Sequence, residues 1–313
     1  MTALVPPLRR DSAKGVAFLV AGIAVFSIQD LILKLISGGY PLHQAMVLRS
    51  FTAIPFLLLL VHLDGGLRTL ITPGTRRMIW RGVVMFTAYT SYYLALAALP
   101  MATTVALYFS APLFITVLSV FMLKEKVGPR RWMALIAGFI GVVIMVRPGG
   151  SLFDWAALMP VLAGATYALS MISARKMGST ETAAALAFWG NAVFLAAALV
   201  MSAVLGWGHF AAEAHPSLGF LLRGWAMPTA FDLMLMMSCG VIAAAGLTLL
   251  TQAYRIAEAS VVTPFEYTGL IWSVLYCWIF WSDWPAAIEW AGIAIIVGAG
   301  LYVLWREALT KPT

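Results

Sequence analysis

The chain has 313 residues, of which 62% are hydrophobic and only 11% are charged, and its mean hydropathy is +0.92. A soluble domain could not cover that much apolar surface, so the composition excludes an ordinary soluble fold and indicates an α-helical membrane protein. The net charge of +7 does not indicate nucleic-acid binding, because the basic residues lie in short clusters between apolar runs. Cys239 and Cys277 lie singly in apolar runs without metal or redox spacing, and we expect neither a metal nor a cofactor.

Apolar runs separated by short polar breaks predict ten membrane-spanning helices. About 20 apolar residues are needed for one crossing, so ten spans with short loops nearly use up the chain. The basic stretch before the first run is not followed by a clear cleavage site, so we expect that run to be retained as a span. The expected ranges are 14–37, 41–63, 78–99, 101–123, 131–147, 155–175, 181–206, 229–251, 259–281 and 285–306.

The distribution of basic residues predicts the orientation of these spans. With the amino terminus inside, all of the 20 Lys and Arg residues lie on the cytoplasmic side except Lys34, Arg49, Arg147 and Arg223. Cytoplasmic loops retain positive charge during insertion. We therefore expect both termini in the cytoplasm and a multi-pass location in the inner (plasma) membrane.

The chain also aligns weakly with itself. A shift of 158 residues sets 100–132 against 258–290, and a shift of 142 sets the first span against the sixth; the long stretch 206–228 supplies the difference. Because matching spans are five apart, the halves 14–147 and 155–306 should lie in the membrane with opposite orientation. Such an inverted repeat lets two halves rock about a central site, which favours a carrier that works by alternating access.

Several short motifs carry a family resemblance. The first half has Ala-Leu-Pro-Met-Ala-Thr at 98–103, then Ala111-Pro112, Glu125 and a small-residue span that ends at Arg147; the second half has a looser copy with Pro264 and Asp283. This pattern resembles the EamA family of the drug/metabolite transporter (DMT) superfamily, and within it the YddG-type exporters of aromatic and other hydrophobic amino acids. The resemblance implies export of small neutral amino acids. Transporters of S-adenosylmethionine and of other metabolites or drugs look similar and stay open as alternatives.

Polar residues inside the first span are candidates for a functional role, because a polar side chain in hydrocarbon should face a cavity, a partner or the interface. Lys34 lies one turn beyond Asp30, so an i,i+4 ion pair gives these two a structural role. Gln29 is the better candidate for lining a cavity.

Aromatic residues and one acid supply the remaining candidates for substrate binding. Span three carries Tyr89 and Tyr93 at helical spacing, and Tyr89 falls too deep for an interfacial belt. The 158-residue shift aligns Tyr108 with Glu266, which is expected either to bind a substrate ammonium and exchange a proton or to be a carboxyl hydrogen-bonded to Tyr or Trp neighbours. Tyr167 and Trp189 complete the set, while Pro112 and Pro264 are candidates for gating.

Other features favour packing. Arg49, inside span two, is expected to tie backbone carbonyls or loop acids more readily than to bind a substrate carboxylate. The small-residue pairs Ala134/Gly138 and Ala294/Gly298 predict close helix contacts.

No enzyme motif is present in the sequence, neither HExxH, nor a GxSxG elbow, nor a Walker lysine, so we expect no catalytic residues. A receptor or scaffold remains the alternative of another class. The expected partners are a small-molecule substrate and the lipid bilayer; the oligomeric state stays open between monomer and homodimer.

Overall fold

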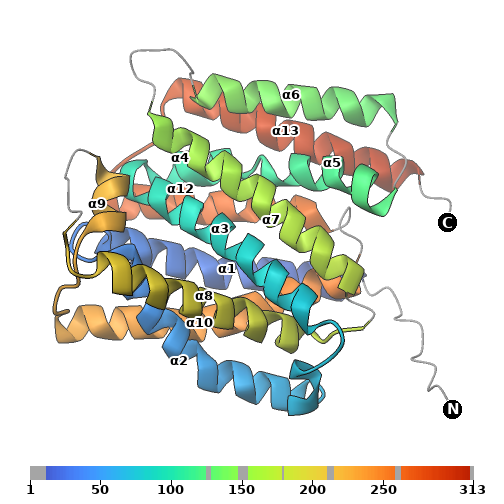
Figure 1. Cartoon of the computed structure of the whole chain (residues 1–313). Coiled ribbons are helices and arrows are strands. Elements are labelled where there is room, and N and C mark those ends of the chain that lie inside the picture. The colour runs from blue at the N-terminus through green and yellow to red at the C-terminus, as the bar shows by residue number, and fades with distance from the viewer. Residues whose placement is uncertain are drawn as a thin grey trace, which may run out of the picture.

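The protein is described here by a computed structural model that covers residues 12–124, 128–146, 154–177, 180–209, 215–257 and 262–310. Throughout these residues the secondary structure is helical, without a strand. The long helices lie roughly side by side and run across the view in Figure 1. Their bounds are α1 Ser12–Ile36, α2 Leu42–Leu63, α3 Thr75–Ala98, α4 Met101–Tyr108, α5 Ala111–Leu123, α6 Pro129–Val146, α7 Leu158–Met177, α8 Ala183–Leu205, α9 Pro216–Leu222, α10 Ala230–Ile256, α12 Thr268–Trp281 and α13 Ala287–Thr310, with short 3₁₀ turns η1 Leu67–Leu70, η2 Trp155–Ala157 and η3 Thr263–Tyr267.

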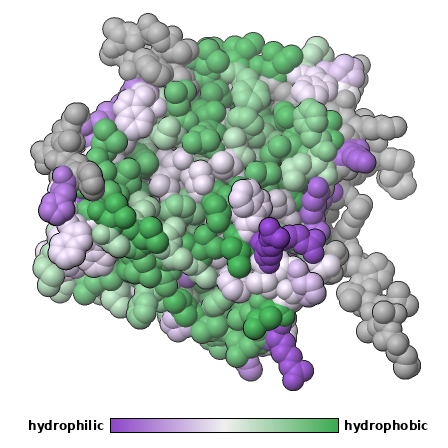
Figure 2. Space-filling view, viewed as in Figure 1, coloured by the Kyte–Doolittle hydropathy of each residue, from purple (hydrophilic) through white to green (hydrophobic). Residues whose placement is uncertain are grey.

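The described residues contain six segments that are long and apolar enough to cross a membrane. They are Ala13–Ile36, Leu42–Leu63, Met101–Met122, Trp155–Met177, Ala183–Leu205 and Ala230–Ile256. The face in Figure 2 is mostly hydrophobic, and its hydrophilic residues gather mainly towards the left and right of the view, where the helices end. A surface of this kind is that of a multi-pass membrane protein.

Helices occupy every expected range, but the range 101–123 is divided into α4 and α5. Pro112 lies in the first turn of α5. Proline has no N–H, and its ring conflicts with the carbonyl four residues earlier, here that of Tyr108, the last residue of α4. The chain therefore interrupts its helix at Phe109 and Ser110 and restarts, with proline in the position that suits it best.

The range 259–281 has a comparable interruption, and the long stretch 206–228 contains a short helix. The 3₁₀ turn η3 precedes α12 and has Pro264 in its first turn. The helix α9 lies in the long stretch and packs against α3. Glu125, Arg147 and the residues 258–261 of the second repeat motif lie outside the described residues.

The closest packing joins helices that are far apart in the sequence. The pairs with the most extensive contact are α1 with α10, α6 with α13, α3 with α7, and α2 with α8. In Figure 1, α6 and α13 form a layer at the top, above α5 and α12. Gly240 allows α10 to approach α2 closely, since a Cβ there would lie 2.5 Å from the Arg49 carbonyl oxygen.

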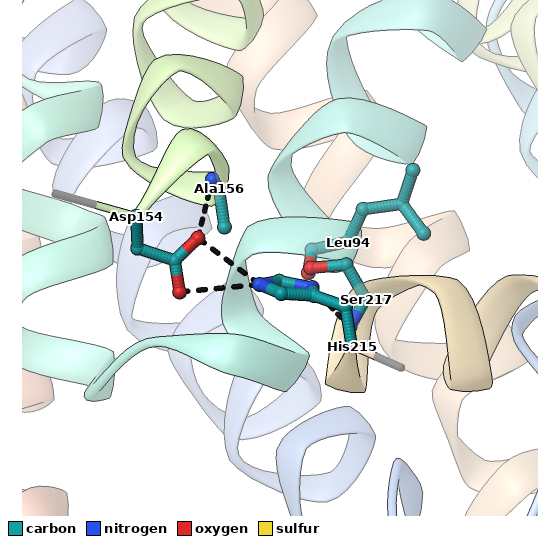
Figure 3. Close-up of polar contacts among 5 residues, drawn as sticks. All are labelled: Leu94, Asp154, Ala156, His215 and Ser217. Atoms are coloured by element: carbon teal, nitrogen blue, oxygen red, sulfur yellow. Dashed lines mark hydrogen bonds and ion pairs between the residues drawn. The ribbon is translucent and has the colours of Figure 1, made fainter. Parts of the chain in front are cut away.

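Polar contacts hold the connecting segments at the end of the bundle where α9 lies. His215 Nε2 lies 3.0 Å from Asp154 Oδ1, and His215 Nδ1 accepts a hydrogen bond from Ser217 N at the start of α9 (Figure 3). Ser217 Oγ donates to the Leu94 carbonyl, and Asp154 also accepts from Ala156 N. These contacts join η2, α9 and α3 to one another.

Candidate functional site

A cavity in the middle of the bundle contains the largest group of polar and aromatic side chains. Its volume is about 90 Å³. It is lined from α1, α3, α4, α7, α10, η3 and α12, with Ser27, Asp30, Tyr89, Tyr92, Tyr108, Tyr167 and Glu266 as its polar members. Phe26, Phe109, Met101, Val105 and Leu250 are among the apolar members.

The polar members form a connected series around the cavity. Tyr92 donates its hydroxyl proton to Asp30 Oδ2 over 3.0 Å, and its ring contacts that of Tyr108 at a centroid distance of 5.3 Å. The Tyr108 ring lies 5.5 Å from that of Tyr167, and Tyr167 donates to Glu266 Oε1 over 2.8 Å. Two carboxyl groups therefore lie at the two ends of a row of three tyrosines.

Glu266 is held by two tyrosines. Its Oε1 accepts hydrogen bonds from Tyr167 and from Tyr254 of α10, while Oε2 has no partner among the described residues. The side chain is only 4% exposed. The hydrogen bonds expected for a packed carboxyl are thus present at one oxygen, and the second oxygen is buried without one.

Asp30 and Lys34 do not form the expected ion pair. Lys34 Nζ donates to the carbonyls of Leu96 and Leu99, over 2.8 and 2.7 Å, at the end of α3. Those carbonyls have no partner within their own helix, because the chain leaves the helix at Leu99 and Pro100. Lys34 therefore binds the end of α3, and Asp30 is left to face the cavity.

The structure brings some of the expected binding residues together and separates others. Tyr89, Tyr108, Tyr167 and Glu266 line the cavity. Gln29 and Tyr93 are fully buried and hydrogen-bond to each other behind it. Trp189, in α8, is not among the residues that line the cavity, and its Nε1 donates to the Leu70 carbonyl over 2.9 Å.

The two prolines expected to act in gating lie where the helix restarts after an interruption, and neither is among the residues that line the cavity. Pro112 opens α5, and Pro264 lies in the first turn of η3.

Sequence reasoning does not select Tyr92, Phe109 or Tyr254 and gives Asp30 only a structural role. Tyr254 lies beyond the expected end of its span at 251, whereas α10 continues to Ile256. For Asp30, the i,i+4 spacing from Lys34 favours an ion pair over a place in the cavity wall. The signal that could have found Tyr92 is its position one turn before Leu96, on the face of α3 that is buried.

The described residues contain no group of three or more His, Cys, Asp or Glu side chains that could hold a metal ion. Cys239 and Cys277 are buried and not in a disulfide. The arrangement of the cavity is suited to binding a small molecule by aromatic contact and by hydrogen bonds to carboxyl groups.

Comparisons with known proteins agree with this description. A solved structure matches 96% of this chain and 99% of its own with a TM-score of 0.65 at 18% identity, which shows a shared fold. The riboflavin transporter of Rhizobium johnstonii is 31% identical over 82% of this chain and 77% of its own length. The S-adenosylmethionine uptake transporter of Rickettsia prowazekii is 26% identical over 94% and 93%, and the pseudopaline exporter of Pseudomonas aeruginosa is 25% identical over 91% and 94%. These relatives are transporters and not enzymes.

A model of the EamA-like transporter family matches residues 13–147. With a relative above 30% identity along most of its length, the chain belongs to the EamA-like transporter family.

Proposed function

We propose that this protein is a carrier that exports small zwitterionic metabolites, above all aromatic and other hydrophobic amino acids, across the inner membrane through the central cavity. The observation that carries the proposal is the composition of that cavity. Aromatic rings line it together with two carboxyl groups, Asp30 and Glu266. Aromatic faces suit an apolar side chain, and carboxyl oxygens suit an ammonium group.

The size of the cavity supports a mechanism in which its walls move. At about 90 Å³ it is smaller than an engineered cavity of about 150 Å³ that holds benzene. A metabolite therefore requires the surrounding rings to move apart. Alternating access supplies such a motion, because a rocking of the two halves opens the central site to one side and then to the other.

The pairing of helices supports two halves related by an inverted repeat, the first from 14 to 147 and the second from 155 to 306. In this repeat α1 corresponds to α7, α2 to α8, α3 to α10, α5 to α12 and α6 to α13. Exchanging the halves therefore turns the contact of α1 with α10 into that of α7 with α3, and both contacts are present. The same exchange turns α2 with α10 into α8 with α3, and α5 with α7 into α12 with α1; all four contacts exist. The pairs α2 with α8 and α6 with α13 map onto themselves, as expected for helices beside a two-fold axis.

Contacts between individual residues show the same symmetry when the two halves are aligned with a shift of 158 residues. Phe109 corresponds to Tyr267, and their rings lie 5.0 Å apart. Gly138 lies against Ala299, and Gly141 lies against Ile296. Because Gly138 corresponds to Ile296 and Gly141 to Ala299, each contact is the image of the other, which is the mark of a self-complementary interface.

This repeat gives ten spans with both termini in the cytoplasm. Three observations support this arrangement. A helix occupies each of the ten expected ranges, and Lys and Arg residues gather on one side of the spans. The family model also matches residues 13–147, which is nearly the length of the first half. The α1 helix begins and α13 ends on the same side in Figure 1, as an even number of spans requires.

A second candidate substrate is S-adenosylmethionine. Relatives that carry this substrate by name align with 94% of the chain, and the two carboxyl groups would suit its positive charge. This candidate shares the carrier mechanism and differs in direction, since those relatives are uptake transporters.

The experiment is uptake of labelled phenylalanine, methionine and threonine into liposomes that hold the purified protein, with and without a proton gradient. Parallel arms use S-adenosylmethionine and riboflavin, and Glu266→Gln is the variant. Saturable uptake of the amino acids, reduced at least tenfold by Glu266→Gln, is the expected result. Uptake of S-adenosylmethionine alone would select the second candidate, and uptake of none of the compounds would refute the proposal.

A further inference from the structure

Arg49 is the largest of the fully buried side chains, and its charge has no hydrogen-bonding partner in the described part of the chain. It lies within α2 and is 1% exposed, yet Nε, Nη1 and Nη2 all lack a partner there. The expectation that it ties carbonyls or loop acids is wrong. Arg81, the second buried arginine among the described residues, does this: its Nε donates to the Ser170 carbonyl over 3.1 Å and its Nη1 to that of Leu186.

Two aromatic rings contact the Arg49 guanidinium. Its Cζ lies 5.0 Å from the centre of the Phe194 ring and 5.8 Å from that of Tyr89. Contact with rings stabilises a cation but leaves five N–H donors unfilled. A buried charge without hydrogen bonds is among the least favourable states in a protein, and inside a membrane such groups mark substrate pathways.

Tyr89 contacts both this guanidinium and the cavity. Its ring lines the cavity and lies over Arg49, and it packs against the rings of Phe26, Tyr93 and Phe194 at 5.5 to 5.9 Å. A movement of this ring is the shortest route by which the guanidinium could reach the cavity, since Tyr89 is the residue that contacts both. The same cavity already has to widen before a metabolite fits.

The charged groups on the two sides of Tyr89 are complementary to a zwitterion, a molecule that carries both an ammonium group and a carboxylate. Asp30 and Glu266 line the cavity with negative charge or hydrogen-bond acceptors, and Arg49 offers a planar fork of donors that matches a carboxylate. We propose that Arg49 is the carboxylate-binding residue of the carrier, exposed when Tyr89 moves aside, so that the protein selects molecules with a carboxylate over the same molecules without one. This inference rests on the proposed carrier function.

The test compares three probes that share the same phenyl group and two-carbon link and differ in which charged groups they carry. Unlabelled phenylalanine, 2-phenylethylamine and 3-phenylpropionate compete against labelled phenylalanine in the liposome assay. For the unmodified protein, 2-phenylethylamine should compete at least tenfold more weakly than phenylalanine, the factor that one charge-assisted hydrogen bond supplies. Equal competition by the two would overturn the inference without any variant.

Variants then assign the effect to Arg49. Arg49→Met should bring phenylalanine and 2-phenylethylamine within about threefold of each other, and Arg49→Lys should fall between, since it retains the charge and loses the fork. The matched control is Arg81→Met, which removes an arginine bonded to carbonyls and should leave the ratio unchanged. An Arg49→Met protein that weakens all probes equally would mean that Arg49 only balances charge, against the inference.

A binding readout separates this inference from the transport proposal. If the unmodified protein carries no amino acid, thermal stabilisation of the purified protein by 3-phenylpropionate and by S-adenosylmethionine is measured instead. Stabilisation that Arg49→Met abolishes and Arg81→Met retains would support the carboxylate site although amino-acid transport had failed. No stabilisation by either carboxylate would refute it.

Discussion

The contact between α2 and α10 offers a sharp test of the packing, at Gly240. A Cβ added there would lie 2.5 Å from the Arg49 carbonyl oxygen, 2.6 Å from Thr52 Cβ and 2.8 Å from the Ala53 nitrogen. Comfortable separations between such atoms are about 3.5 Å or more, and two of these three neighbours are backbone atoms that cannot rotate away. Gly240→Ala must therefore push the two helices apart by about 1 Å, and we expect a loss of about 3 kcal/mol of stability.

Two other glycines calibrate this value. At Gly82, in α3, the nearest atom is Val193 Cγ2 at 2.8 Å and the nearest backbone atom is the Trp189 oxygen at 3.2 Å, so Gly82→Ala should cost about 1 kcal/mol. At Gly298 nothing lies within 4 Å, and Gly298→Ala should stabilise α13 by up to about 1 kcal/mol through helix propensity.

The assay is thermal unfolding of the purified variants in one detergent, followed by tryptophan fluorescence. The expected order of midpoints is Gly298→Ala above the unmodified protein, then Gly82→Ala, then Gly240→Ala by several degrees. If Gly240→Ala and Gly298→Ala unfold at the same temperature, α2 and α10 do not approach as described.

Three further predictions concern polar side chains. Lys34→Met should lower the free energy of unfolding by about 2 kcal/mol, because it leaves two carbonyls at the end of α3 without their donor; an unchanged unfolding midpoint would contradict this. Asp30→Asn retains the acceptor for Tyr92 and should leave the midpoint within a degree or two, yet reduce the initial rate of phenylalanine uptake about tenfold at a subsaturating concentration; equal rates would remove Asp30 from the binding site. His215→Ala should speed hydrogen exchange of the α9 amides about tenfold, since it removes the contact with Asp154 and the cap of α9, and unchanged protection would show that α9 is held by packing alone.

The helices were predictable because each apolar run ends at a strong break, and the observed bounds fall close to the expected ones. The interruption between α4 and α5 was visible in principle, since Pro112 stands in the middle of the expected span. Hydropathy does not register it, because Phe109 and Ala111 are as apolar in a bend as in a helix. The short helix α9 was missed for the opposite reason, because it lies in a stretch of mixed polarity.

The site was less predictable, because successive residues on a helix differ by about 100° in direction and the sequence does not say which one faces inward. Gln29 and Asp30 illustrate this: the first turns to Tyr93 and the second to the cavity. Similarly, Gly138 and Gly298 stand in the same small-residue pattern, yet Gly138 packs tightly and Gly298 has no neighbour. The depth of a residue in its span could be estimated from the sequence, whereas the direction in which its side chain points depends on which helices pack around it.

The pairing of distant helices also sets the order in which the protein can assemble. The α1 helix ends at Ile36, and its main partner α10 begins only at Ala230. At about 5–20 residues per second, the ribosome needs roughly 10–40 s to make the chain between them. During that time α1 is in the membrane with Asp30 exposed to lipid or to a temporary neighbour, and α6 likewise awaits α13. Insertion and folding of this protein are therefore separate events in time, and the interval between them is when membrane proteases and insertion factors can act on it.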